Sequence, residues 1–100
     1  MVRFERSARV AQGKLLEARK WAQEVTDYAN QNHPEGKLQV FSERFGNIGR
    51  ISWQADFDNL AALDQYQQSF DTDKGYWELL NKSNELFVED SVKDTVFETL

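Results

Sequence analysis

The chain has 100 residues with one proline, five glycines, no cysteine and a formal net charge of −5. This length fits one domain, residues 1–100. The lack of cysteine excludes thiol nucleophiles and thiolate metal sites, and the negative charge opposes nucleic-acid binding because phosphate backbones repel it. We expect a cytoplasmic protein with no membrane partner, since no segment approaches the ~20 apolar residues of a spanning helix.

The first third of the chain predicts a strand followed by a helix. Residues 2–9 alternate between apolar and polar side chains, although Arg6 interrupts the apolar side. From about residue 11, apolar residues recur at steps of three and four, which predicts a helix to about residue 32 with a mostly alanine buried face. The segment NHPEG ends this helix, because Pro34 disfavours helical geometry at the preceding residue.

The middle of the chain predicts a hairpin. Residues 37–45 and 48–57 are strand-like, and Gly46-Asn47 between them tolerates the positive φ angles of a tight turn. With these turn residues, Val40 lies opposite Trp53, and the apolar residues of both strands share one face.

The segment NLAALDQYQQSF at 59–70 predicts a second helix. We expect Asp58 to cap its N-terminus and Leu60, Leu63 and Phe70 to face inward. These positions would place the helix against the apolar face of the hairpin.

The last third predicts another helix and a strand. Thr72 or Asp73 is expected to cap a helix in KGYWELLNKSNELF, residues 74–87. The tail FVEDSVKDTVFETL, residues 87–100, alternates as a strand does, and a bend near Ser91 would split it in two.

This order of elements predicts an α+β fold, the split βαβ or ferredoxin-like sandwich: an antiparallel sheet in the order 4-1-3-2 with helices on one face. The other face would be mixed in character and is formed by Glu5, Ser7, Arg9, Phe41, Glu43, Phe45, Arg50, Ser52, Gln54, Glu89 and Ser91. The first 20 residues carry six Lys/Arg and two Asp/Glu, whereas the remainder carries six and fifteen. We expect cross-strand pairing of the basic first strand with the acidic tail (Glu89, Asp90 and Asp94), rather than a basic recognition patch.

Two stretches carry a family resemblance: ERFGNIGRISW as the central hairpin, and LAALDQYQQSFDTDKGYWELLNKSNELFVEDSVKDTVFETL as an acidic-capped helix, an aspartate break and an aromatic-bearing helix. The chain resembles the dimeric α+β barrel superfamily, and within it the small bacterial NIPSNAP-like proteins. The resemblance implies a homodimer in which two sheets pair face to face, so that the mixed face becomes the interior of a barrel. Members of the superfamily include cofactor-independent oxygenases, haem-degrading enzymes, isomerases and proteins without assigned activity, and no catalytic set transfers to this chain.

The mixed face supplies the candidate site. The ligand-pocket candidates are Glu5, Ser7, Phe41, Glu43, Arg50, Ser52 and Gln54. A carboxylate, a guanidinium, hydroxyls and an amide beside aromatic rings suit a small polar organic ligand. The alternative is a dimer interface in which these groups satisfy one another, with Glu43 and Arg50 as a cross-strand pair.

Other chemistries are disfavoured. His33 is the only histidine, so we expect an exposed helix-end residue and no metal site. DTDKG lacks the spacing of a calcium loop, and GNIG joins strands instead of preceding a phosphate-binding helix. RNA-recognition modules share this order of elements, but they need aromatic residues where Arg50, Ser52 and Gln54 lie.

We therefore predict a homodimer without cofactor or metal that binds a small polar organic ligand or acts as a cofactor-independent oxygenase-like or isomerase-like enzyme. The alternative is a non-enzymatic homodimeric interaction protein, and a remote alternative is an RNA-recognition-like module. A cavity of several hundred Å³ at the mixed face or under the helices, with unpaired polar groups inside, would favour a ligand-binding protein or cofactor-free enzyme.

Overall fold

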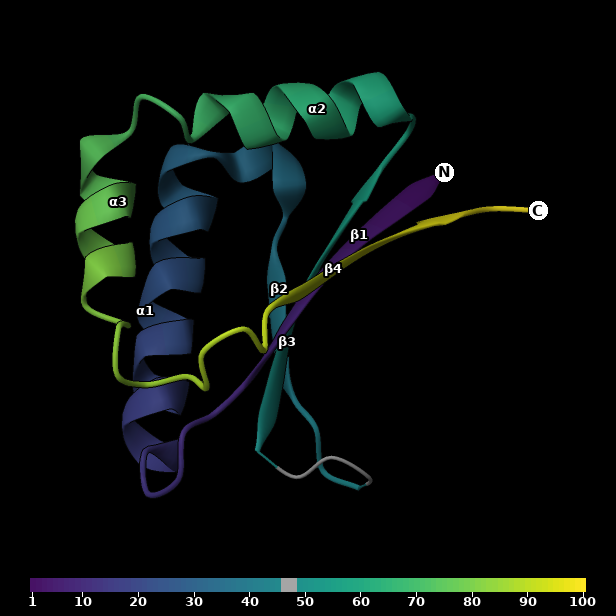
Figure 1. The fold of residues 1–100 in the computed structure, drawn as a ribbon. Helices are drawn as coiled ribbons and strands as arrows, with labels where there is room; N and C mark the ends of the chain where they lie inside the picture. Colours follow the sequence, from purple (N-terminus) through teal and green to yellow (C-terminus); the bar gives the residue numbers. More distant parts are fainter. Residues whose placement is uncertain (46–48) are drawn as a thin grey trace.

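The computed structural model describes residues 1–45 and 49–100. Its elements are β1 (Val2–Arg9), α1 (Leu15–Asn32), the short 3₁₀ helix η1 (Pro34–Gly36), β2 (Gln39–Ser42), β3 (Arg50–Phe57), α2 (Leu60–Ser69), α3 (Lys74–Asn81) and β4 (Lys93–Glu98). The strands form one sheet in the order β2-β3-β1-β4, with every neighbouring pair antiparallel. This is the predicted ferredoxin-like fold and strand order, seen edge-on in Figure 1.

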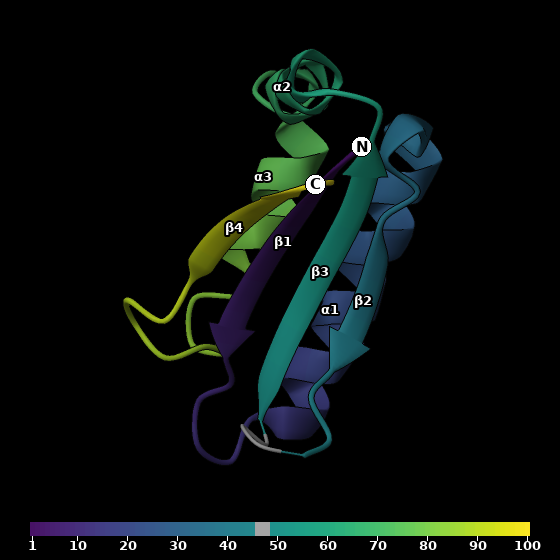
Figure 2. The ribbon, with the colours of Figure 1, turned by 90° about the vertical axis from the view of Figure 1, so that its right-hand side faces the viewer.

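The helices of residues 1–45 and 49–100 all lie on one side of the sheet. Figure 2 looks onto the other side, where β4, β1, β3 and β2 run across the view and no helix lies in front of them. We call this uncovered side the open face. The two chain ends lie close together, and the Thr99 N–H donates to the Met1 carbonyl over 3.0 Å.

The observed register confirms the predicted hairpin pairing. Val40 lies opposite Trp53, and the Glu43 N–H donates to the Arg50 carbonyl over 2.9 Å. The turn predicted at Gly46-Asn47 lies outside the described residues. Because side chains alternate along a strand, this register sends Trp53 and its alternate neighbours toward the helices and leaves the polar set on the open face.

The core lies between the sheet and the helices. The alanine face of α1 lets the helix lie close to the sheet, and Ala18, Ala22 and Ala29 are at most 2 % exposed. Ile51 on β3 is the largest side chain that is less than 2 % exposed among the described residues. The small residues of α1 therefore fix the helix on the sheet, as the sequence pattern predicted.

The helix starts differ from the predictions. Helix α1 begins at Leu15 rather than near residue 11, because Gly13 with φ +78° breaks the helical path before it. Helix α2 is capped by the Asn59 side chain, which accepts from the Ala62 N–H, so Asp58 is not the N-cap. With this start Leu60 faces outward and is 52 % exposed, contrary to the prediction.

The C-terminal third is also shorter in regular structure than predicted. Asp73 caps α3 as expected, but the helix ends at Asn81, and turns carry the chain to Phe87, which forms a single bridge with Val10. The bend predicted near Ser91 is confirmed: the Ser91 N–H donates to the Val88 carbonyl. The strand proper begins only at Lys93, so Glu89 and Ser91 are not on the sheet.

The charge pairing expected between the first strand and the tail is confirmed at one position. Arg6 on β1 lies opposite Asp94 on β4 and forms an ion pair with it. No described helix is long and apolar enough to cross a membrane.

Candidate functional site

A cavity of about 640 Å³ lies under the helices, between the sheet, α2, α3 and the chain leading into β4. Eight aromatic residues line it: Phe4, Trp21, Trp53, Tyr66, Phe70, Tyr76, Trp77 and Phe87. Its polar lining comes from Arg6, Gln67, Asp71, Tyr76, Ser83 and Asp94. Pockets for small organic molecules have this size and character, a mostly apolar wall with a few polar groups.

The three tryptophans of the chain all line this cavity, and the protein itself satisfies their indole N–H groups. Trp21 donates to the Leu79 carbonyl over 2.8 Å, and Trp77 donates to the Phe70 carbonyl over 3.0 Å. Trp53 donates to the Thr26 hydroxyl over 3.1 Å. Because a satisfied indole N–H is not free to bind a ligand, these residues offer only ring surface.

One polar corner interrupts the aromatic wall. Arg6 binds Asp94 through two bonds, Nε to Oδ1 at 2.7 Å and Nη2 to Oδ2 at 2.8 Å. Both side chains are more than 40 % exposed, so the pair lies where the cavity meets solvent. The bond from Arg6 lowers the pKa of Asp94. Burial raises the pKa of Tyr76, while the nearby Arg6 charge opposes this shift, so the Tyr76 hydroxyl stays protonated near neutral pH and can donate.

Tyr66 forms the other end of the aromatic wall. Its ring packs against Phe57 and Phe70, and its hydroxyl is buried without a hydrogen-bond partner among the described residues. Burial raises the pKa of Tyr66 to about 12. The Tyr66 side chain lies so close to Gly36 that a Cβ on Gly36 would overlap the tyrosine ring and hydroxyl. A glycine at position 36 therefore leaves the space that Tyr66 occupies.

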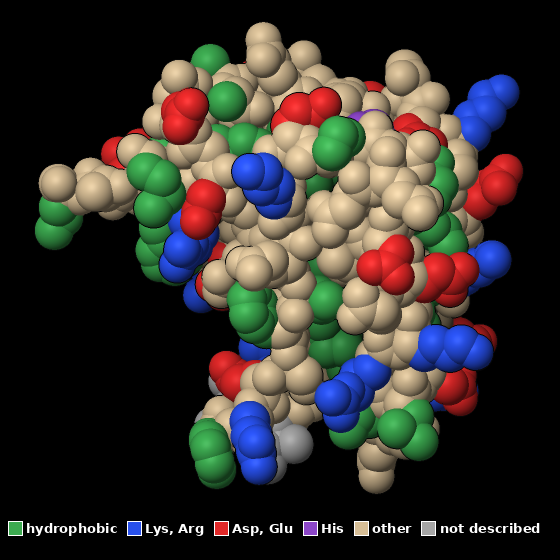
Figure 3. Space-filling model, turned by 180° about the vertical axis from the view of Figure 1, so that it is seen from behind, with side chains coloured by type: hydrophobic (Ala, Val, Ile, Leu, Met, Phe, Trp, Pro, Cys, Tyr) green, Lys and Arg blue, Asp and Glu red, His purple; other side chains and the backbone are tan. Residues whose placement is uncertain are grey.

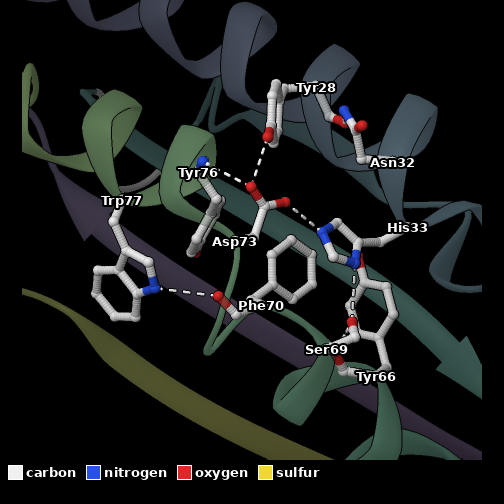
Figure 4. A network of polar contacts seen from close by, with 9 residues as sticks. All are labelled: Tyr28, Asn32, His33, Tyr66, Ser69, Phe70, Asp73, Tyr76 and Trp77. Atoms are coloured by element: carbon white, nitrogen blue, oxygen red, sulfur yellow. Dashed lines mark hydrogen bonds and ion pairs between the residues drawn. The ribbon is translucent and has the colours of Figure 1, made fainter.

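His33 is buried rather than exposed, which corrects the prediction from sequence. Only a small part of the histidine reaches the surface in Figure 3, in agreement with its 7 % exposure. Its Nδ1 lies 2.8 Å from Ser69 Oγ, and its Nε2 lies 2.7 Å from Asp73 Oδ2 (Figure 4). The ring also stacks on Phe70, with 3.9 Å between the centroids.

This network joins the ends of the three α-helices found among the described residues. His33 follows α1, Ser69 ends α2 and Asp73 caps α3. Asp73 also accepts from the Tyr28 hydroxyl over 2.6 Å, and this bond, followed by the one from His33, lowers the pKa of Asp73. The Ser69 hydroxyl contacts the Tyr66 carbonyl over 2.6 Å, so its one proton is already used in the fold. The network is therefore a structural connection between helices, and it holds the wall of the cavity in place.

The structure places the seven candidates from the sequence on or beside the open face, and none is among the residues that line the cavity. Glu5, Ser7, Arg50, Ser52 and Gln54 lie on the two central strands, while Phe41 lies on β2 and Glu43 directly follows it. Some of these groups satisfy one another: Gln54 donates to Glu5 over 3.1 Å, and Arg50 donates to Ser7 over 3.0 Å.

The predicted cross-strand ion pair between Glu43 and Arg50 does not form at 4 Å or less among the described residues, although their backbones are bonded. The predictions from sequence missed the cavity because its lining comes from all parts of the chain. The sequence did contain one sign of the cavity, which was the large number of aromatic residues predicted to lie between the sheet and the helices.

These observations define an α+β protein of the ferredoxin-like fold, with an aromatic cavity on its helical side. No family model matches the chain, and no curated protein matches it either. Several solved structures, however, match the fold of the chain over nearly its whole length. A NIPSNAP family protein from Agrobacterium tumefaciens has a TM-score of 0.80 and 18 % identity, covering 99 % of this chain and 92 % of the other.

Two further structures show the range of the likeness. A NIPSNAP domain protein from Burkholderia xenovorans has a TM-score of 0.80 and 11 % identity, with 100 % and 95 % coverage of the two chains. A structure described as an antibiotic biosynthesis monooxygenase has a TM-score of 0.74 and 14 % identity, with 100 % and 99 % coverage. The chain thus has the fold of NIPSNAP proteins and of these monooxygenases, which confirms the predicted resemblance in fold.

Proposed function

We propose that this protein binds a small planar organic molecule in the aromatic cavity. The observation that carries the proposal is the cavity itself, about 640 Å³ with eight aromatic side chains in its wall. Flat rings bind well there, because stacked and edge-on aromatic contacts add to the burial of apolar surface. The criterion set from the sequence was a cavity of several hundred Å³ with unpaired polar groups inside. The cavity volume and the Tyr66 hydroxyl, which is buried without a hydrogen-bond partner among the described residues, support ligand binding over a purely structural module.

The polar corner determines which end of the ligand points outward. Tyr76 supplies a hydroxyl donor and Arg6 a guanidinium, and both line the cavity. A ligand with a carbonyl, hydroxyl or acidic group at one end would direct that group toward these residues and place its rings among the tryptophans. The ligand class is therefore a polycyclic aromatic molecule with one polar edge.

Tryptophan fluorescence provides the test, because all three tryptophans line the cavity. Anthraquinone-2-sulfonate should quench their emission with saturation, whereas benzenesulfonate, which has the same anionic group and one ring, should bind at least tenfold more weakly. Ser83→Phe places a ring in the cavity lining and should weaken anthraquinone-2-sulfonate binding at least tenfold, a loss of about 1.4 kcal/mol or more.

Ser91→Phe is the matched control. Ser83 and Ser91 each donate a hydroxyl to the carbonyl three residues earlier, over 2.6 Å, but only Ser83 is among the residues that line the cavity. The Ser91 variant should bind as the parent does. Equal binding by both variants, with both folded by circular dichroism, would contradict a ligand site in the cavity.

A cofactor-independent oxygenase is the second candidate, favoured by the monooxygenase named among the similar structures. Such an enzyme needs a substrate that supplies the electrons. In the simplest case O2 converts a ring CH2 to a carbonyl: one oxygen atom becomes the carbonyl oxygen, and the other leaves as water with the two hydrogen atoms. Anthrone, which would give anthraquinone, is the test substrate. Protein-dependent O2 uptake that falls in Tyr76→Phe would support this activity, and uptake at the protein-free rate would contradict it.

We also propose that the protein is a homodimer through the open face. That face has no helix over it, and it exposes two aromatic side chains, Phe41 at 46 % and Phe97 at 50 %. Sedimentation at micromolar concentration should give a dimer, and Phe41→Asp should shift it to a monomer. A parent protein that sediments as a monomer would contradict the dimer and leave the cavity proposal intact.

A further inference from the structure

Two arginines lie directly opposite each other on the open face. Arg9 on β1 pairs with Arg50 on β3. Because Arg9 lies two residues after Ser7 on the same strand, the side chains of all three residues point to the open face. Cβ atoms of directly opposed residues are ~4.5–5.5 Å apart, and like charges in this position destabilise a sheet. The sequence thus places two cations together at a cost in stability.

Arg9 and Arg50 differ from Arg3 and Arg6 on β1, because each of those two arginines has a carboxylate partner. Arg3 binds Asp56 through bonds of 2.8 and 3.1 Å, and Arg6 binds Asp94 in the same two-bonded manner. Among the described residues, neither Arg9 nor Arg50 has a carboxylate within 4 Å.

Arg50 also holds an unsatisfied donor. Its Nε is buried without a hydrogen-bond partner among the described residues, and such a group costs free energy unless something accepts its proton.

The surroundings hold this pair in position. The Nη1 of Arg50 donates to Ser7 Oγ over 3.0 Å, and Ser7 is only 6 % exposed. The Arg9 N–H donates to Ser91 Oγ over 3.0 Å, which fixes the backbone beneath the other guanidinium. Lys93 on β4 lies opposite Ser7 and adds a third cation to the same face. Glu43, the residue after β2, lies opposite Arg50 on the side away from Arg9, but its carboxylate forms no ion pair with Arg50 within 4 Å.

We propose that Arg9 and Arg50 form a binding site for a small oxyanion, a phosphate or carboxylate group, on the open face. A guanidinium presents a planar fork of N–H donors that fits two oxygens of such a group, and two opposed forks can hold one anion between them. The anion would remove the repulsion between the arginines by accepting from their guanidinium groups. In the proposed homodimer this site faces the interface, where two uncompensated cations would be still more costly.

The site is separate from the aromatic cavity, since Arg9 and Arg50 lie on the open face and the cavity lies under the helices. Inorganic phosphate is the probe, titrated at constant ionic strength against chloride and followed by the Nε–Hε signals of the arginines in ¹⁵N–¹H NMR spectra. The signals of Arg9 and Arg50 should shift with saturation. Those of Arg3, already paired with Asp56, should not.

Four variants complete the test. Arg9→Gln and Arg50→Gln should each weaken phosphate binding at least tenfold, whereas Arg3→Gln should leave it unchanged. Arg50→Lys keeps the charge but loses the fork, so intermediate binding is expected even if the glutamine variant folds poorly. Equal shifts at all arginines, or the same affinity in Arg9→Gln as in the parent, would overturn the proposal. A shift that chloride reproduces at equal concentration would overturn it too.

Discussion

The contact between α1 and α3 permits a sharp test at Gly75, the second residue of α3. A Cβ at this position would overlap the Tyr28 hydroxyl and lie 3.0 Å from Tyr28 Cζ. Gly75→Ala should therefore push the tyrosine aside and break its 2.6 Å bond to Asp73, the residue that caps α3 and binds His33. Removing the hydroxyl with Tyr28→Phe should relieve most of the overlap.

The magnitude follows from two opposing effects. An alanine inside a helix is favoured over glycine by up to about 1 kcal/mol. Overpacking typically costs about 1–3 kcal/mol. In the parent, the net cost of Gly75→Ala should thus lie between about 0 and 3 kcal/mol. In the Tyr28→Phe background, the same change should be neutral or stabilising by up to about 1 kcal/mol. A domain of this size shifts its Tm by roughly 4–8 °C per kcal/mol.

Urea unfolding of the four proteins, the parent, the two single variants and the double variant, measures the interaction. We expect the double variant to be more stable than the sum of the single effects by at least ~1 kcal/mol. Effects that add to within ~0.5 kcal/mol, the usual range for independent sites, would show that Tyr28 does not occupy the space beside Gly75.

Three further predictions concern stability. Because Arg6 lowers the pKa of Asp94, this carboxyl group contributes its full stabilisation above its unfolded pKa of about 3.9 and loses it as the pH falls through the lower folded pKa. The urea midpoint of the parent should therefore decrease between pH 6 and pH 3, and Asp94→Asn should make this decrease smaller. An unchanged decrease would contradict the contribution of Asp94. Asn59→Ala should lower the free energy of unfolding by about 1 kcal/mol through loss of the α2 cap, whereas Asp58→Ala should lower it by less than half as much. The reverse order would mean that Asp58 is the cap, as the sequence predicted. Ile51→Val, at a side chain 1 % exposed, should cost about 0.5–1.5 kcal/mol in thermal unfolding, whereas no cost would mean that this site is not tightly packed.

The sequence predicted the sheet well because strand faces follow from a period of two. The alternation in β1 and β3 identified which side chains face the helices, and the hairpin pairing of Val40 with Trp53 followed from it. Helix ends were predicted less well. Asp58 and Asn59 are both good capping residues, and only the backbone conformation selects Asn59.

The functional groups were harder to predict, since their partners lie far apart in the sequence. His33 is buried because Ser69 and Asp73, 36 and 40 residues later, supply partners for both ring nitrogens. The aromatic residues of the cavity come from β1, α1, β3, α2, α3 and the loop at Phe87, and no local pattern marks them as one site.

Local periodicity in the sequence predicts the order of the strands, the face that each strand presents to the helices, and the mixed character of the other face. It does not predict where β2 and β4 begin and end. Only the folded structure brings the aromatic side chains together around a cavity and lets His33 join three helices. It also leaves Arg9 and Arg50 facing each other with no carboxylate of the described residues within 4 Å. Those properties depend on the distances between segments that the chain brings together only when it folds.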